Sequence, residues 1–223
     1  MDIFRQHEIF EIEVLDNMKS AKVLEHLVFG GGTMLRLCHE LKRYSNDLDF
    51  WFIKSVPQKT YFDNIQRELE ENYEITDAQI KRYTLLFEIR SANYPRRLKI
   101  EIRREMKDCD YQEKIAFSPF SNRQVLLKCH TLEQTMKNKI AAFIDRGEIR
   151  DCFDIEFLIR RGVELPAQPE KQLIEVQKKI TLLGDKEFTV KLGSILESDI
   201  RDYYTANRFS YLEEKLALAL SRS

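Results

Sequence analysis

Two aspartates separated by one residue are the first feature of this sequence that could do chemistry. Asp47 and Asp49 lie in the run Tyr44-Ser-Asn-Asp-Leu-Asp-Phe50, where polar and apolar residues alternate. This alternation predicts a strand in which both carboxylates project from one face and the apolar residues enter the core. Two carboxylates on one face repel unless a cation lies between them, and Mg²⁺ prefers carboxylate oxygens and phosphates. A solvated strand end is the simpler alternative.

A third carboxylate and a glycine turn favour the metal interpretation. Glu101 lies in Lys99-Ile-Glu-Ile102, a predicted strand, and a polar side chain there needs a partner. That partner is either a shared metal ion or a cross-strand cation. Three carboxylates on neighbouring strands could hold two metal ions, which activate a 3′-hydroxyl and stabilise a leaving pyrophosphate. Gly31 and Gly32 precede a predicted helix start near Thr33, where backbone N–H groups could bind a triphosphate.

The pattern of apolar residues divides the chain into two parts. Strand patterns occur only as far as Cys129, and helical patterns alone follow it. We therefore expect a small mixed β-sheet flanked by helices in residues 1–130, and a helical C-terminal domain in residues 131–223. The expected strands are 28–29, 48–53, 82–90, 98–104 and 125–129, and the expected helices are 10–27, 33–41, 61–71, 131–144, 150–160, 170–183, 188–197 and 209–220.

Charge is balanced over the whole chain but not along it. The net charge is −1 over 223 residues, with 43% hydrophobic residues, as in an ordinary globular protein. The segment from Lys81 to Lys107 contains nine lysines and arginines but only three glutamates. This excess of positive charge is typical either of a surface that binds a polyanion such as RNA or of a solvated hairpin. Tyr83, Tyr94 and Tyr111 would stack on bases in the first case and pack against the hairpin in the second.

Cysteine usage and hydropathy indicate the compartment. The four cysteines are isolated, without a C-x-x-C pair, and suit a reducing environment. The histidines have no zinc-ligand spacing, no apolar run is long enough to cross a membrane, and the N-terminus has no signal-peptide pattern. We expect a cytoplasmic protein without a membrane partner.

Several of these runs together resemble one known family. Phe29-Gly-Gly-Gly-Thr-Met-Leu-Arg36, Arg43-Tyr-Ser-Asn-Asp-Leu-Asp-Phe50 and Lys99-Ile-Glu-Ile102 are similar, in this order, to the motifs of the AbiEii/AbiGii toxin family in the polymerase-β-like nucleotidyltransferase superfamily. The resemblance implies an α+β fold, with a polymerase-β-like core followed by a C-terminal helical bundle. It also implies a metal site for Mg²⁺ or Mn²⁺ at Asp47, Asp49 and Glu101, and a nucleotide site at Gly31, Gly32, Thr33 and Ser45. Gly30 departs from the family, which usually has a lysine there.

The resemblance extends to the helical part. Lys139-Ile-Ala-Ala142, Arg146 and Arg150-Asp-Cys-Phe-Asp154 match a family pattern, which implies that Lys139 and Arg146 contact the nucleotide. Asp151 or Asp154 would be the base, or a positioning group, for the acceptor hydroxyl. The simpler alternatives are solvent-facing cations at Lys139 and Arg146 and a surface ion pair between Arg150 and Asp154.

These features lead to one preferred function and two alternatives. The preferred function is a magnesium-dependent toxin of a toxin–antitoxin or phage-defence pair, which transfers a nucleoside monophosphate from an NTP to an acceptor hydroxyl. The resemblance and the local basic charge favour RNA as acceptor, with a tRNA 3′ end foremost, and a cognate antitoxin protein as partner. The alternatives are a small-molecule acceptor, as in antibiotic nucleotidyltransferases, and an inactive binding module with this fold.

Overall fold

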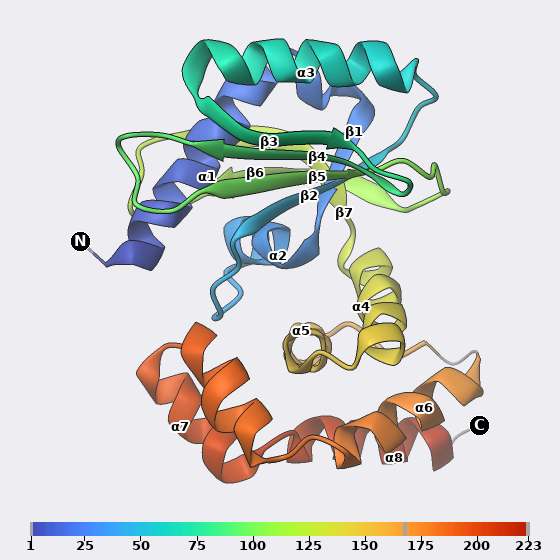
Figure 1. The fold of residues 1–223 in the computed structure, drawn as a ribbon. Coiled ribbons are helices and arrows are strands. Elements are labelled where there is room, and N and C mark those ends of the chain that lie inside the picture. Colours follow the sequence, from blue (N-terminus) through green and yellow to red (C-terminus); the bar gives the residue numbers. More distant parts are fainter. Residues whose placement is uncertain (1, 167–168, 222–223) are drawn as a thin grey trace. The chain divides into compact units, whose positions relative to one another are not determined.

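The computed structural model describes residues 2–166 and 169–221, and the chain divides into two compact units (Figure 1). The first unit contains Met1–Glu40 and Tyr44–His130, and the second contains Leu41–Arg43 and Thr131–Ser223. The short segment Leu41–Arg43 therefore belongs with the helical unit, although it lies within the first part of the sequence. No helix in the described residues is long and apolar enough to cross a membrane.

The first unit is built on one seven-stranded sheet in the order β3-β4-β5-β2-β1-β7-β6. The sheet is mixed, because β2 pairs with β5 and β1 with β7 in parallel, whereas the other neighbours are antiparallel. The strands are β1 Leu27–Gly30, β2 Asp47–Phe52, β3 Glu74–Ile80, β4 Thr84–Arg90, β5 Leu98–Arg103, β6 Tyr111–Phe117 and β7 Gln124–His130. This sheet with helices around it, followed by helices alone, confirms the predicted fold class.

Helices of the first unit bury the apolar residues of the sheet. They are α1 Ile3–Ser20, the 3₁₀ helix η1 Val23–His26, α2 Gly31–His39 and α3 Gln58–Asn72. In Figure 1, α3 lies along the β3–β4 side of the sheet, and the ring of Phe62 stacks on that of Phe87. Leu48, Phe50 and Phe52 of β2 are at most 2% exposed. The side chains that alternate with them are therefore left on the other face, which is the face of Asp47 and Asp49.

The second unit is helical. Its elements are α4 Leu132–Arg146, α5 Ile149–Arg160, α6 Glu170–Thr181, the π turn Glu187–Leu192, the 3₁₀ helix Gly193–Ile195, α7 Ser198–Asn207 and α8 Ser210–Ser221. The hydroxyl of Thr131 caps α4 by accepting the Gln134 N–H at 3.1 Å, as the sequence predicts. Gly147 ends α4 in a left-handed conformation, with φ of +68°.

Some elements differ from the prediction. Strands β3 and β6 and helix α7 were not expected. Both strands are at the edges of the sheet, where few side chains are buried, so their apolar pattern is weak. The helix expected to begin near Thr33 begins at Gly31, and the expected N-terminal helix ends at Ser20 rather than reaching 27. The segment expected to be helical over 188–197 is helical from Glu187 to Ile195, but as a π helix followed by a 3₁₀ helix rather than as an α-helix.

Candidate active site

The three carboxylates of the first unit lie on neighbouring parallel strands. Asp49 on β2 is in register with Glu101 on β5, and Asp47 is in register with Lys99. Residues in register share a face, so all four side chains project from the same side of the sheet. Lys99 Nζ lies 3.0 Å from Glu101 Oε1 and 3.7 Å from Asp47 Oδ2. A cation thus stands between two of the three carboxylates, and the partner that Glu101 requires is Lys99 in this structure.

The donor set suits a hard metal ion, although Lys99 occupies the centre of it. Carboxylate oxygens are the ligands that Mg²⁺ prefers, and the side chains of Asp47 and Glu101 are 41% and 22% exposed, so substrate and water can reach them. Across residues 2–166 and 169–221, no three acidic, histidine or cysteine side chains are grouped closely enough to hold a metal ion. Burial acts to lower the pKa of Lys99, but Glu101, Asp47 and Asp49 outweigh it and raise this pKa. Lys99 is therefore charged at neutral pH and offsets part of the negative charge of the three carboxylates.

The glycine turn places the start of α2 against Asp49. Gly31 has φ of +76°, a conformation that favours glycine, and a Cβ atom there would collide with the carboxylate of Asp49. The Thr33 hydroxyl, fully buried, donates to the backbone carbonyl of Asp47 at 2.7 Å. The N-terminus of α2, with its unpaired N–H groups and positive dipole end, is thereby fixed beside the carboxylates. Gly32 is buried in the same turn, and Ser45 is half-buried.

A network that the sequence did not reveal holds the segment before Asp47. The His7 ring Nε2–H donates to the carbonyl of Asn46 at 3.1 Å, and Arg96 donates to the Asn46 side chain at 3.3 Å. Burial lowers the pKa of His7, so the ring is neutral at pH 7. Tyr44 lies between the ring of Phe4, whose centroid is 4.0 Å away, and the guanidinium of Arg36 at 4.4 Å. His7 and Phe4 lie outside the apolar stripe that begins at Phe10, so no sequence signal marked them.

Gly30 is required by its neighbours rather than by its backbone conformation. Its φ of −152° is extended and open to any residue. A Cβ atom there would lie 2.7 Å from His130 Nδ1 and would also collide with the six-membered ring of Trp51. The two rings lie 4.8 Å apart and fill the space beside Gly30. Burial lowers the pKa of His130 to about 4, so neither ring replaces the positive charge of the lysine that the family usually has here.

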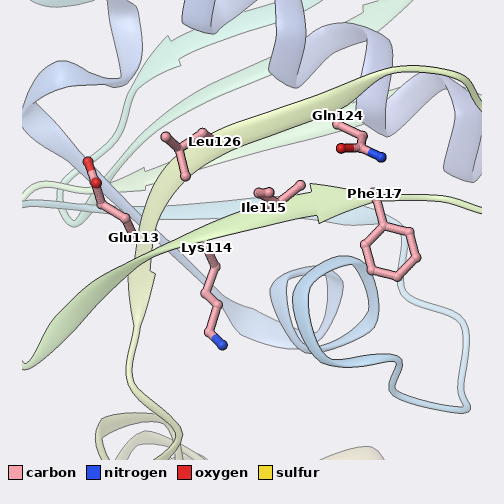
Figure 2. Close-up of a pocket in the computed structure, with 6 residues that line it drawn as sticks. All are labelled: Glu113, Lys114, Ile115, Phe117, Gln124 and Leu126. Atoms are coloured by element: carbon pink, nitrogen blue, oxygen red, sulfur yellow. The ribbon is translucent and has the colours of Figure 1, made fainter.

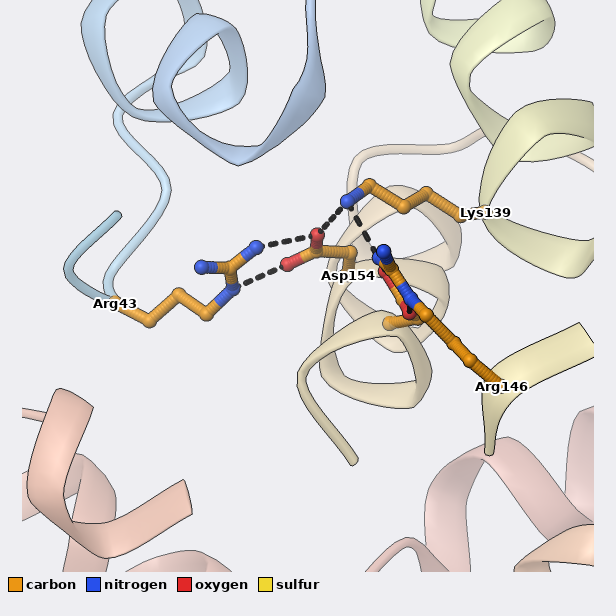
Figure 3. Close-up of polar contacts among 5 residues, drawn as sticks. Arg43, Lys139, Arg146 and Asp154 are labelled. Atoms are coloured by element: carbon orange, nitrogen blue, oxygen red, sulfur yellow. Dashed lines mark hydrogen bonds and ion pairs between the residues drawn. The ribbon is translucent and has the colours of Figure 1, made fainter. Parts of the chain in front are cut away.

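Lys139, Arg146, Asp151 and Asp154 form one ionic cluster with Arg43, and both carboxylates of the cluster are buried (Figure 3). Asp154 accepts from Arg43 Nε and Nη2, each at 2.6 Å, and lies 2.6 Å from Lys139 Nζ. Asp151 accepts from Arg146 Nε at 2.6 Å and from Lys139 Nζ at 3.2 Å. Lys139 therefore bridges the two aspartates, and Arg43 joins the short segment Leu41–Arg43 to α5.

This cluster settles which simple alternatives hold. Asp151 and Asp154 are 0% exposed and Lys139 is 7% exposed, so Lys139 is not a solvent-facing cation. Asp154 pairs with Arg43 and Lys139, so the alternative of a surface ion pair between Arg150 and Asp154 does not hold. Burial acts to raise the pKa of Asp154, but the charges of Arg43 and Lys139 outweigh it, and this pKa lies below its ordinary value. Asp154 is therefore ionised and is a weak base.

The basic stretch gathers at one end of the sheet. Arg104 donates to the carbonyl of Lys81 at 2.7 Å, and its own backbone N–H donates to the carbonyl of Tyr83. The turn between β3 and β4 and the end of β5 are thereby joined, which collects the cations Lys81, Arg82, Arg103, Arg104 and Lys107. Tyr83 is 63% exposed there, and Tyr111 on β6 is 48% exposed. Tyr94 instead stacks on Phe10 and donates to Glu13 at 2.8 Å, so it has a packing role.

A shallow hollow of about 610 Å³ lies elsewhere, on the β6–β7 hairpin (Figure 2). Its apolar lining comes from Ile115, Phe117 and Leu126, which are 39–49% exposed. Lys114 points to the opposite side of the hairpin from Leu126. None of its lining residues is a carboxylate, glycine or lysine of the candidate site, so the chemistry is not centred there.

Solved structures with a similar fold define the class of protein. A candidate nucleotidyltransferase of H. pylori has a TM-score of 0.60 at 18% identity and covers 94% of this chain and 96% of its own. JHP933 of Helicobacter pylori has a TM-score of 0.59 at 20% identity, with 95% and 93% covered. MenT4, a nucleotidyltransferase toxin from Mycobacterium tuberculosis H37Rv, has a TM-score of 0.50 at 13% identity, with 96% and 94% covered. The chain has a nucleotidyltransferase fold.

The sequence itself identifies the family. No curated protein matches it. The family model described as nucleotidyl transferase AbiEii toxin, type IV TA system, matches residues 13–210. The chain therefore belongs to the AbiEii family and is a nucleotidyltransferase toxin, which confirms the resemblance found in the motifs. Membership of a toxin–antitoxin family implies an antitoxin partner.

Proposed function

We propose that this toxin transfers a nucleoside monophosphate from an NTP to an RNA hydroxyl, with a tRNA 3′ end as the preferred acceptor and Mg²⁺ or Mn²⁺ as cofactor. One observation carries the proposal. Asp49 and Glu101 are in register on parallel strands, Asp47 projects from the same face, and the N-terminus of α2 lies against Asp49. Carboxylates for a metal ion and a helix N-terminus for phosphates are thereby adjacent, as transfer of a phosphoryl centre requires.

The start of α2 binds the triphosphate. Gly31 and Gly32 present backbone N–H groups without side chains, and no acidic residue lies in the first turn of α2. The positive end of the helix dipole favours anions at this place. The buried hydroxyl of Thr33 fixes the turn to Asp47, and Ser45 lies two residues before Asp47. The phosphates are thus held beside the carboxylates.

The carboxylates of Asp47, Asp49 and Glu101 are the groups that would hold the divalent ion. When bound there, Mg²⁺ neutralises phosphate charge and orients the acceptor hydroxyl and the α-phosphate. Lys99 is the counter-charge in its absence. Its side chain is 36% exposed, so it can turn from Glu101 towards a substrate phosphate. The site can exchange one cation for another without leaving its carboxylates unpaired.

The family motifs support a nucleotide-binding role for the ionic cluster of the second unit. Lys139 is the phosphate-binding cation, and its charge offsets the negative charge that develops during transfer. Asp151 and Asp154 hold its ammonium in place and act as positioning residues, because both are fully buried and ionically paired. Arg146, whose side chain is 41% exposed, fixes Asp151 and can contact the nucleotide.

Transfer of label from α-labelled NTPs to total RNA, with and without Mg²⁺, tests the proposal. Asp49→Asn keeps the size of the side chain and removes the charge, so it should abolish labelling. Asp63→Asn, on an exposed helical pair with Lys59, is the matched control and should label like the wild type. Labelling that persists in Asp49→Asn would refute the metal assignment. Labelling of a small-molecule panel in place of RNA would refute the acceptor.

A further inference from the structure

Trp51 occupies a position on the carboxylate face that the chemistry described above does not use. It lies on β2 two residues after Asp49, and side chains two apart on a strand share a face. Residues two apart are separated by roughly 6–7 Å along the strand. The ring is half-buried: one edge covers Gly30 and His130 packs beside it, while the remainder is accessible. An aromatic surface therefore lies next to the catalytic carboxylates.

A free cation stands beside this ring. Arg103 on β5 is in register with Trp51, as Glu101 is with Asp49. Arg103 is exposed, and no ion pair joins it to any residue that the structure describes. It belongs to the basic end of the sheet, together with Lys81, Arg82, Arg104 and Lys107. Along β2 and β5, the carboxylates of Asp49 and Glu101 are therefore followed by Trp51 beside Arg103, and then by the positively charged end of the sheet.

We propose that Trp51 is a stacking platform for a base at the 3′ end of a single-stranded RNA acceptor, and that Arg103 binds the adjoining phosphate. Bases stack on aromatic rings whatever their identity, and cations beside the ring bind the backbone. The charge pattern favours the acceptor over the NTP, because a polyanion extends into the basic end whereas the triphosphate is held at α2. The inference rests on the proposed function, since it places the acceptor next to Asp49 and Glu101.

The position of the Trp51 ring explains why residue 30 is a glycine. A side chain at this position would displace the Trp51 ring, because its Cβ atom alone collides with both Trp51 and His130. A chain with lysine here cannot hold the indole in this place without other changes. The exchange of lysine for glycine therefore gives up a cation beside the phosphate turn and gains a fixed aromatic surface.

Trp51 is the only tryptophan of the chain, so its fluorescence reports on this site alone. The experiment titrates the wild-type protein separately with a single-stranded oligoribonucleotide, with each NTP and with inorganic polyphosphate, because transfer needs both substrates and none occurs with one alone. The RNA should quench the emission strongly, whereas polyphosphate, which lacks bases, should not. Quenching by NTPs alone would assign the ring to the nucleotide and overturn the proposal, as would no quenching by any of the three ligands.

Variants give a second and independent measurement. With labelled RNA, anisotropy should show that Trp51→Ala weakens binding about tenfold or more, while Trp51→Phe, which keeps a ring, stays within about threefold of the wild type. In the transfer assay Trp51→Ala should raise KM for RNA and leave KM for the NTP unchanged. Phe117 is an exposed aromatic residue on the edge strand β6, and Phe117→Ala is the control. This variant should change neither the affinity for RNA nor the KM for RNA.

The two proposals fail in different ways. If Trp51→Ala binds and uses RNA like the wild type while label transfer to RNA still depends on Asp49, the stacking role is wrong and the proposed function stands. If RNA binding depends on Trp51 but no label is transferred to it, the proposed function fails and the binding surface stands. Arg103→Met should weaken RNA binding and reduce its dependence on salt. An unchanged salt dependence would remove Arg103 from the inference.

Discussion

Replacing Asp154 by asparagine should lower the free energy of unfolding by about 3–5 kcal/mol, the usual cost of breaking a buried ion pair on one side. Asp154 is 0% exposed and lies 2.6 Å from two nitrogens of Arg43 and from Lys139 Nζ. Arg43 is 3% and Lys139 7% exposed, so both cations would stay buried with less compensating charge. Domains of this kind are stable by about 5–15 kcal/mol, so the loss is a large share of the whole.

Urea denaturation followed by circular dichroism measures this loss. With a dependence of about 2 kcal/mol per molar urea, the midpoint should fall by about 1.5–2.5 M. The exposed pair of Lys59 and Asp63 provides the control, and Asp63→Asn should change stability by at most about 1 kcal/mol. A loss below about 1 kcal/mol in Asp154→Asn would refute the claim that this carboxylate holds the cluster together.

Acid should weaken the same contact. The pKa of Asp154 is lower in the folded chain than its ordinary value of 3.8, because the charges of Arg43 and Lys139 outweigh the effect of burial. A group of this kind stabilises the fold above its unfolded pKa, and the contribution is lost as pH falls through the folded pKa. The difference in stability between wild type and Asp154→Asn should therefore be constant from about pH 5 to 7 and shrink below about pH 4. A difference that grows on acidification would contradict this assignment.

Two further predictions concern the glycine turn before α2 and the lysine between the carboxylates. Gly31→Ala should abolish label transfer, because its Cβ atom meets the Asp49 carboxylate, and should cost about 1–3 kcal/mol through its φ of +76°. Gly162 has φ of +87° and open space around it, so Gly162→Ala should lower the stability by a similar amount but leave label transfer unchanged. Equal transfer activity of the two variants would contradict the prediction. Lys99→Met should lower the Mn²⁺ concentration for half-saturation about fivefold, measured by titration, because a competing charge worth about 1 kcal/mol at this exposed site is removed. An unchanged concentration would show that Lys99 does not compete with the metal ion.

Much of the first unit follows from local patterns in the sequence. Strand β2 alternates with period two, so its buried and exposed faces, and the side on which Asp47 and Asp49 lie, are predictable. The Thr131 cap and the helix after it are equally local. The edge strands β3 and β6 were missed because an edge buries few apolar side chains. The helix α7 was also missed: of the residues it contains, Tyr204 alone is buried, so no apolar stripe marks it.

Contacts between distant residues could not be predicted from such patterns. Arg43 and Asp154 are 111 positions apart, and nothing in either segment indicates that they pair. The family motifs in the sequence marked both Lys139 and Asp154 as site residues, but they could not show that both side chains are buried. In the same way, His7 reaches Asn46 over 39 positions, and the reason for Gly30 appears only once Trp51 and His130 are seen beside it.

We propose that the nucleotidyl group, and no other part of the NTP, is transferred to RNA. Parallel reactions with α-labelled and γ-labelled NTP, in the presence of Mg²⁺ and total RNA, test it most directly. Label from the α-phosphate should enter RNA, label from the γ-phosphate should leave as pyrophosphate, and the Asp49→Asn variant should give neither labelled product. Label from the γ-phosphate in RNA would instead show a kinase-type transfer and would rule out nucleotidyl transfer.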